Sequence, residues 1–69
     1  MNNPKVEIKD KILLTIEEAG ILSNIGINMM RELVKTHGGR FTVKVGANGG
    51  KVLIHRQKFE NFLMNVSSI

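Results

Sequence analysis

The stretch "LTIEEAGILSNIGINMMRELVK", residues 14–35, holds two helix patterns separated by only a few residues. Thr15, followed three residues later by Glu18, forms a capping box, and this motif predicts that the first helix begins here. The second half, "INMMRELVK", again has apolar residues at helical spacing. Two short helices joined by a tight, glycine-containing turn are typical of a helix-turn-helix.

The first helix is expected to stop near Ser23–Asn24, with Gly26 in the turn that follows. The residues expected on its buried face are Ile16, Ala19 and Leu22, with Ile21 beside them. Gly20 lowers helix stability by roughly 1 kcal/mol relative to alanine, unless close packing at this point excludes a side chain.

The second helix follows at once, and Asn28 is well suited to be its N-cap. Its inward face is expected to hold Met30, Leu33 and Val34. The outer and flanking faces are expected to hold Met29, Arg31, Glu32 and Lys35. Gly38 and Gly39 are expected to end the helix through a left-handed residue.

Beyond these glycines, two strand-like runs, "RFTVKVG" and "KVLIHR", flank the segment "GANGG". Alternation in the first run predicts one face with Phe41, Val43 and Val45 and another with Thr42 and Lys44. Asn48-Gly49 between the runs is a strong hairpin signal. The last segment, "RQKFENFLMNV", has Phe59, Phe62, Leu63 and Val66 at the spacing of a third amphipathic helix.

The chain of 69 residues is expected to form a single domain, residues 1–69, with a marginal core and no room for a deep catalytic cleft. The absence of cysteine excludes disulfides, thiolate zinc sites and a cysteine nucleophile. Residues 1–12 are expected to form a loose arm or a short strand around Val6 and Ile8, and residues 64–69 a tail. No apolar run is long enough to span a membrane, and no secretory signal is apparent, so we expect a cytoplasmic protein without cofactor or metal.

Positive charge is concentrated in one part of the chain. Residues 1–30 carry three basic and four acidic residues, whereas residues 31–58 carry seven basic residues against Glu32 alone, a net charge of +6. This asymmetry gives one region a potential that attracts polyanions, although charge alone is equally consistent with a solvated surface that keeps a small protein soluble.

The helix order suggests that the second helix enters a DNA major groove and reads bases from its outer face. The candidates there are Asn28, Met29, Arg31, Glu32 and Lys35. Arg31 suits a bidentate guanine contact or a phosphate contact. Asn28 either reads adenine or caps the helix, and its position favours the cap. Met29 is more typical of a core contact than of a base reader.

The basic hairpin is then interpreted as a wing. Its glycine-rich tip lets backbone amides approach a phosphate backbone or minor groove, and two lysines flank the tip. The wing candidates are Lys44, Asn48, Gly49, Gly50 and Lys51. Alternatively the hairpin covers the helices and its lysines discourage aggregation. Further candidate phosphate contacts, which are equally consistent with solvated charge, are Arg40, Arg56 and Lys58.

"LTIEEAGILSNIGINMMRELVK" followed by "KVGANGGKVLIHRQKFENFL" closely resembles the excisionase-type DNA-binding proteins of conjugative transposons and phages, in the MerR-like helix-turn-helix group. The resemblance extends over residues 14–63 and implies an α+β fold. That fold is a small winged helix-turn-helix with two N-terminal helices, a β-hairpin wing and a C-terminal helix. The tip "GANGGK" is longer and richer in glycine than the family's usual wing, and Met29 interrupts the usual polar start of the second helix.

The resemblance implies a non-enzymatic accessory factor that binds and bends double-stranded DNA. Such a factor helps a tyrosine recombinase, the integrase, to excise a mobile element in the bacterial cell. It also implies side-by-side self-association on DNA and a tail, Met64 to Ile69, that contacts the integrase or a neighbouring copy. Two alternatives stay open: a transcriptional regulator of a mobile element with the same fold, and a protein-interaction module with a basic face.

We expect no catalytic activity. His37 lies at a predicted helix end, where a cation favours the helix dipole. His55 lies beside Arg56 with no carboxylate to orient it, and the adjacent Glu17 and Glu18 already belong to a helix start. No acid–base pair therefore stands out.

Overall fold

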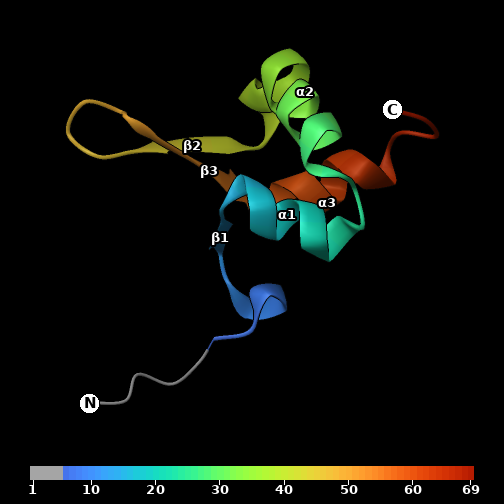
Figure 1. The fold of residues 1–69 in the computed structure, drawn as a ribbon, viewed down its shortest axis with the longest axis horizontal. Coiled ribbons are helices and arrows are strands. Elements are labelled where there is room, and N and C mark those ends of the chain that lie inside the picture. The colour runs from blue at the N-terminus through green and yellow to red at the C-terminus, as the bar shows by residue number, and fades with distance from the viewer. Residues whose placement is uncertain (1–5) are drawn as a thin grey trace.

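The computed structural model describes residues 6–69, and Figure 1 shows their arrangement. Three α-helices and a small antiparallel sheet form an α+β winged helix-turn-helix. The helices are α1 (Ile16–Ser23), α2 (Ile27–His37) and α3 (Arg56–Met64). The strands are β1 (Leu13–Leu14), β2 (Thr42–Val45) and β3 (Lys51–His55), in the order β1-β3-β2, and the 3-10 turns are η1 (Ile8–Asp10) and η2 (Gly38–Arg40).

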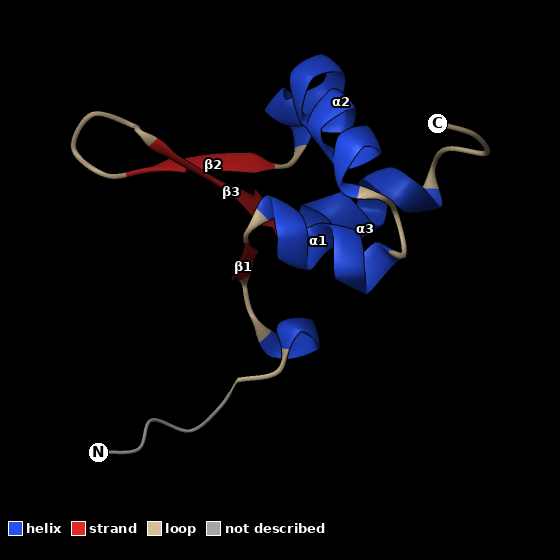
Figure 2. Cartoon of the chain, in the orientation of Figure 1, coloured by secondary structure: helices blue, strands red, loops and turns tan. Residues whose placement is uncertain are grey.

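The predicted order of helix, turn, helix, hairpin and helix is confirmed (Figure 2). The expected strand around Val6 and Ile8 is wrong, because Ile8 opens η1 and packs against the core. The short strand lies later, where Leu14 pairs with Ile54 and neither side chain is exposed. The first five residues of the expected arm lie outside the described part of the chain.

The predicted capping box at the start of α1 is confirmed in both directions. The Glu18 backbone N–H donates to Thr15 Oγ1 at 3.0 Å, and the Thr15 N–H donates to Glu18 Oε1 at 3.0 Å. Lys11 Nζ also forms an ion pair with the Glu18 carboxylate. These contacts lower the pKa of Glu18, chiefly through the hydrogen bond from the Lys11 side chain and then through that from the Thr15 backbone.

The face of α1 that the core covers differs in part from the prediction. Ala19 and Gly20 are buried, whereas Ile21 is 70% exposed and Leu22 is 36% exposed. The cause is the turn, which folds back so that the Ile25 N–H donates to the Gly20 carbonyl at 3.0 Å. A Cβ at position 20 would lie 2.8 Å from the Ile25 carbonyl oxygen, so this buried side of the helix takes glycine, while Ile21 and Leu22 are exposed.

The turn between α1 and α2 closes at Asn24, not at a glycine. Asn24 adopts the left-handed conformation with a φ of 62°, and its N–H donates to Gly20 and Ile21 carbonyls. Gly26 then becomes the N-cap of α2, with extended φ and ψ. Asn28 is therefore the second residue of the helix and not its cap, which corrects the prediction.

The inward face of α2 follows the prediction, with Met30 and Leu33 buried and Val34 packed against the core. The helix ends at His37, before the two glycines, as expected. The expected left-handed residue is absent from this end, because Gly38 stays right-handed and the chain continues into η2. Thr42 Oγ1 donates to the Gly38 carbonyl at 2.6 Å and joins this turn to the wing.

The β-hairpin is confirmed, and Val43 and Val45 lie on one face of β2 with Thr42 and Lys44 on the other, as predicted, whereas Phe41 departs from the prediction. Phe41 is buried while its ψ of 6° interrupts the extended backbone, so it lies outside the strand alternation. Thr42 pairs with the buried Ile54, and cross-strand partners share a face, so the core face of β2 begins at Thr42. Val43, paired with Leu53, lies on the opposite, half-buried face.

The core gathers where the sheet, α2 and α3 meet. Its buried side chains are Leu14, Ala19, Met30, Leu33, Phe41, Ile54, Phe59 and Phe62. The predicted inward face of the third helix is confirmed for Phe59, Phe62 and Leu63, whereas Val66 packs against the core from beyond the end of α3 at Met64. The wing extends from this core, and Figure 1 shows it projecting away from the helices.

Gly20→Ala is expected to destabilise the fold. An added Cβ would lie 2.8 Å from the Ile25 carbonyl oxygen and 3.3 Å from Met30 Cγ. Overpacking of this kind costs about 1–3 kcal/mol, against a gain in helix propensity of about 1 kcal/mol. Urea denaturation followed by circular dichroism measures the change. Gly39→Ala is the control, because nothing lies within 4 Å of its added Cβ, and equal stability of the two variants would contradict the close approach at Gly20.

The capping box is expected to weaken in acid. The pKa of Glu18 is lower in the folded protein than the ordinary value of a glutamate, so its contribution to stability is complete above that ordinary value and is lost as the pH falls through the folded pKa. Glu18→Gln keeps an acceptor for the cap but does not titrate. The parent's melting temperature should therefore fall more steeply between pH 5 and about pH 3 than that of Glu18→Gln. Glu17→Gln, at an exposed neighbouring position, should retain the parent's steep dependence.

Candidate nucleic-acid interface

The outer face of α2 presents a set of exposed side chains anchored by a buried inner face. All five residues predicted for this face are exposed: Asn28, Met29, Arg31, Glu32 and Lys35. Arg31 and Lys35 are one helical turn apart, and among residues 6–69 no ion pair or hydrogen bond engages either side chain. Both cations are therefore available to a ligand.

The roles of Asn28 and Met29 in the structure differ from those predicted from sequence. Because Gly26 takes the N-cap position, the Asn28 carboxamide is not used to close the helix start. Met29 is 41% exposed and is not part of the core, which takes the neighbouring Met30 instead. Both side chains thus belong to the surface of the first turn of α2.

The wing carries its two lysines on opposite faces of the ribbon. Lys44 pairs with Val52, and Lys51 pairs with Val45. Side chains of directly paired residues point to the same face, while successive residues alternate. Lys44 therefore shares the face of Val52, and Lys51 the opposite face, and both lysines are exposed. A ribbon with a cation on each face is suited to a groove with a phosphate backbone on each side.

The wing tip is a tight turn whose fourth residue is glycine. The Gly49 N–H donates to the Gly46 carbonyl at 3.0 Å, so Ala47 and Asn48 are the central residues. Gly46 and Gly49 have φ values of 105° and 62°, which other residues rarely adopt. Asn48 and Gly50 are exposed, and Gly49 is half-buried against the Lys44 side chain. The tip therefore offers backbone and one carboxamide to a ligand.

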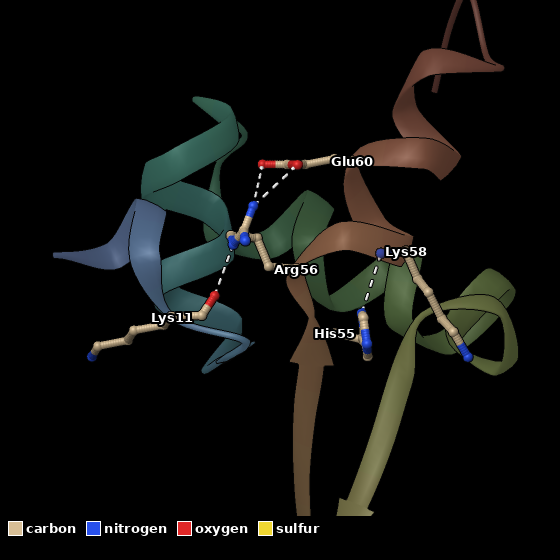
Figure 3. A network of polar contacts seen from close by, with 5 residues as sticks. All are labelled: Lys11, His55, Arg56, Lys58 and Glu60. Atoms are coloured by element: carbon tan, nitrogen blue, oxygen red, sulfur yellow. Dashed lines mark hydrogen bonds and ion pairs between the residues drawn. The ribbon is translucent and has the colours of Figure 1, made fainter. Parts of the chain in front are cut away.

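The three further basic candidates separate into two groups. Arg40 and Lys58 are exposed and line one surface recess together, at the junction of η2 and α3. Arg56 is different, because its side chain is held by the protein itself. Figure 3 shows Arg56 between the arm and α3, with Glu60 above it, while the Lys58 side chain lies on the other side of that helix.

Arg56 joins two segments of the chain. Its Nε donates to the Lys11 carbonyl at 2.7 Å, and its Nη1 lies 3.3 Å from Glu60 Oε1 (Figure 3). Its backbone N–H donates to the Ile12 carbonyl at 3.0 Å. These bonds fasten the segment before β1 to the start of α3. We therefore assign Arg56 a structural role and leave it out of the candidate interface.

His55 has a role that sequence reasoning did not find. It ends β3 and is the N-cap of α3, where its Nδ1 accepts the Lys58 backbone N–H at 3.3 Å (Figure 3). The signal in the sequence is a polar acceptor directly before "RQKFENFLM", a position that usually holds serine, threonine or aspartate. This cap makes the passage from wing to helix abrupt, without an intervening loop.

Other kinds of site find little support in the described residues. Within residues 6–69, no group of three histidine or acidic side chains is arranged to hold a metal ion. In the same range, none of the helices has the length and apolar character needed to cross a lipid bilayer. Comparison with protein-family models, curated proteins and solved structures finds no match for this chain. The resemblance to excisionases therefore rests on the sequence motifs alone.

Arg56→Met is expected to lower the stability of the fold. The salt dependence of nucleic-acid binding should stay the same as in the parent. The substitution keeps much of the side-chain volume but removes the charged hydrogen bond to the Lys11 carbonyl, a loss of about 1–3 kcal/mol. Thermal denaturation measures the effect. Lys9→Met removes the same charge from an exposed position in η1 and should be close to neutral. A flatter salt dependence of DNA binding at unchanged stability would contradict this assignment.

Proposed function

We propose that this protein binds double-stranded DNA with α2 in the major groove and the wing on the minor groove or its phosphate backbone. The observation that carries the proposal is the pairing of two exposed elements. One is the uncovered outer face of α2, and the other is a ribbon with a lysine on each face. The cations of both elements, Arg31, Lys35, Lys44 and Lys51, lie within residues 31–58, which carry a net charge of +6. A basic helix and a basic ribbon on one small domain suit a polyanionic duplex.

The geometry of α2 supports base reading. A major groove about 12 Å wide admits one α-helix, whose exposed side chains then meet the base edges. Arg31 carries a fork of donors that matches guanine O6 and N7. Asn28, released from capping, offers the donor and acceptor pair that suits adenine. Lys35, one turn beyond Arg31, is better suited to a phosphate.

The more specific proposal is that DNA binding serves excision. We infer from the excisionase resemblance that the protein bends DNA and helps a tyrosine recombinase to excise a mobile element in the bacterial cytoplasm. On this view neighbouring copies associate side by side, and the tail Met64 to Ile69 contacts the recombinase or another copy. A transcriptional regulator would use the same α2 and wing, and a requirement for this protein in an excision assay with the recombinase separates the two roles.

A gel-shift titration tests the DNA-binding proposal. The probes are a duplex from the flanking DNA of the host element and a random duplex of the same length, each at two salt concentrations. Discrete complexes that form first on the flanking duplex are expected. Equal and weak binding to both duplexes, abolished by salt, would overturn sequence-preferring binding and favour a basic surface for a protein partner.

Arg31→Ala and Lys51→Ala are expected to weaken DNA binding in different ways. Arg31→Ala should cost about 1–3 kcal/mol on the preferred duplex and reduce the preference over random DNA. Lys51→Ala should weaken binding to all sequences and reduce the log–log salt slope by about 0.9. Filter binding over a range of salt concentrations measures both effects. Lys9→Ala, an exposed lysine on η1, controls for net charge, and parental affinity in the Arg31→Ala, Lys51→Ala double variant would contradict the two-element proposal.

A further inference from the structure

A surface recess lies where η2 meets α3, outside both α2 and the wing. It is lined by Arg40, Lys58, Asn61, Phe62 and Asn65 and has a volume of about 340 Å³. Lys58, Asn61 and Asn65 are spaced by three and four residues, so they lie along one side of α3 and its C-cap. Arg40 reaches this side from the turn between α2 and β2. Sequence spacing does not predict that these four polar side chains belong together.

The Arg40 guanidinium is held in place over an aromatic ring. Its Cζ lies 5.7 Å from the centroid of Phe62. Phe62 is only 6% exposed, and its ring is fixed by Phe41 at 5.2 Å and by His37 at 5.2 Å between ring centroids. A cation–π contact of this kind restrains the side chain and leaves its hydrogen-bond donors free. The side chain therefore loses less conformational entropy when a ligand binds.

Lys58, the second cation of the recess, has no acidic side chain beside it. Figure 3 shows Lys58 on the side of α3 that faces β2, whereas Glu60 lies on the opposite side and contacts Arg56. None of the described residues that line the recess carries a carboxylate. Among residues 6–69, neither Arg40 nor Lys58 has an ion-pair partner. Two like charges brought to one recess without a counter-charge favour binding of an anion.

Two carboxamides add neutral donors to the same recess. Asn65 Nδ2 donates to the Asn61 backbone carbonyl at 2.8 Å, which fixes the orientation of that amide. Each carboxamide carries two N–H donors, so Asn65 retains one after this bond. Asn61 is exposed, and within the described residues no hydrogen bond engages its side chain. The recess thus combines charged and neutral donors, as a phosphate with several acceptor oxygens requires.

We propose that this recess binds one phosphate of the DNA backbone, with Arg40 and Lys58 on the same phosphate. The proposal rests on the proposed DNA binding and adds a third contact, beyond α2 and the wing. Arg40 lies between the last residue of α2 and the first residue of β2, the two elements proposed to hold the duplex. A backbone phosphate near either element is therefore the anion closest to the recess. Arg56, the third basic candidate of this segment, takes no part.

A double-mutant cycle tests the shared phosphate. Arg40→Gln, Lys58→Gln and the double variant are compared with the parent by filter binding on the flanking duplex and on a random duplex. Each single variant should lose about tenfold in affinity on both duplexes, since a charged hydrogen bond contributes about that factor. The double variant should lose clearly less than the product of the two factors, because both cations contact one group. Lys9→Gln should stay within about twofold of the parent.

Folding and ligand source are checked separately. Thermal melts show whether the variants fold. Arg40→Gln loses the contact with the Phe62 ring, and if that variant does not fold, Lys58→Gln still tests the recess. NMR titrations of the parent follow the side-chain amide signals of Asn61 and Asn65 with a short duplex and with inorganic phosphate. Shifts of these signals with the duplex are expected.

Each contrary result identifies what has failed. Parental affinity in both single variants, together with sequence-preferring binding by the parent, would overturn the recess contact and leave the proposed function intact. Strictly multiplicative losses would overturn the shared phosphate. Amide shifts with inorganic phosphate but none with the duplex would mean a free-anion site in place of a DNA contact. A parent that binds neither duplex would overturn the proposed function, and the recess contact with it.

Discussion

The contact among three phenylalanine rings determines how the wing, α2 and α3 sit relative to one another. They are all the aromatic residues of Phe, Tyr and Trp type in the chain. The Phe41 ring lies 5.1 Å from that of Phe59 and 5.2 Å from that of Phe62, between centroids. Phe41 follows η2 directly and precedes β2, so this one side chain fastens the end of α2 and the root of the wing to α3. Phe41 and Phe59 are the largest fully buried side chains among the described residues, so their contact matters most in a core this small.

This arrangement separates the stabilising charges from the available ones. The pair Lys11–Glu18 joins the arm to α1, and Arg56, which pairs with Glu60 within α3, joins α3 to the arm through the Lys11 carbonyl. The basic residues of α2 and the wing have no such partners among the described residues, and only Glu32 lies among them. Arg56 illustrates the difference, because it belongs to the basic stretch by sequence and to the structural network by contact. The net charge of a sequence segment therefore overestimates the number of cations that are free to contact a ligand.

The order of elements, the capping box and the exposed face of α2 could be predicted from sequence, because each depends on local spacing. The departures have non-local causes. Ile21 faces outward because the turn carbonyl of Ile25 crowds Gly20. Phe41 lies outside the predicted face of β2 because its backbone leaves the extended conformation and its ring packs on Phe59 and Phe62 of α3. The recess around Arg40 and the tie between Arg56 and the Lys11 carbonyl join residues far apart in sequence, and no local pattern records such pairs.

The way in which the wing and α2 are anchored also bears on which contacts would give affinity and which would give sequence preference in the proposed DNA complex. The wing is anchored at its root by the buried Ile54, while its tip contributes nothing to the core. The glycines of the tip fit its tight turn, but their freedom must be lost if the tip is ordered on a ligand. In the proposed DNA complex, contacts at the tip would then gain little net affinity, and backbone amides distinguish bases poorly. Sequence preference would be left to α2, whose side chains project from a helix anchored by Met30 and Leu33.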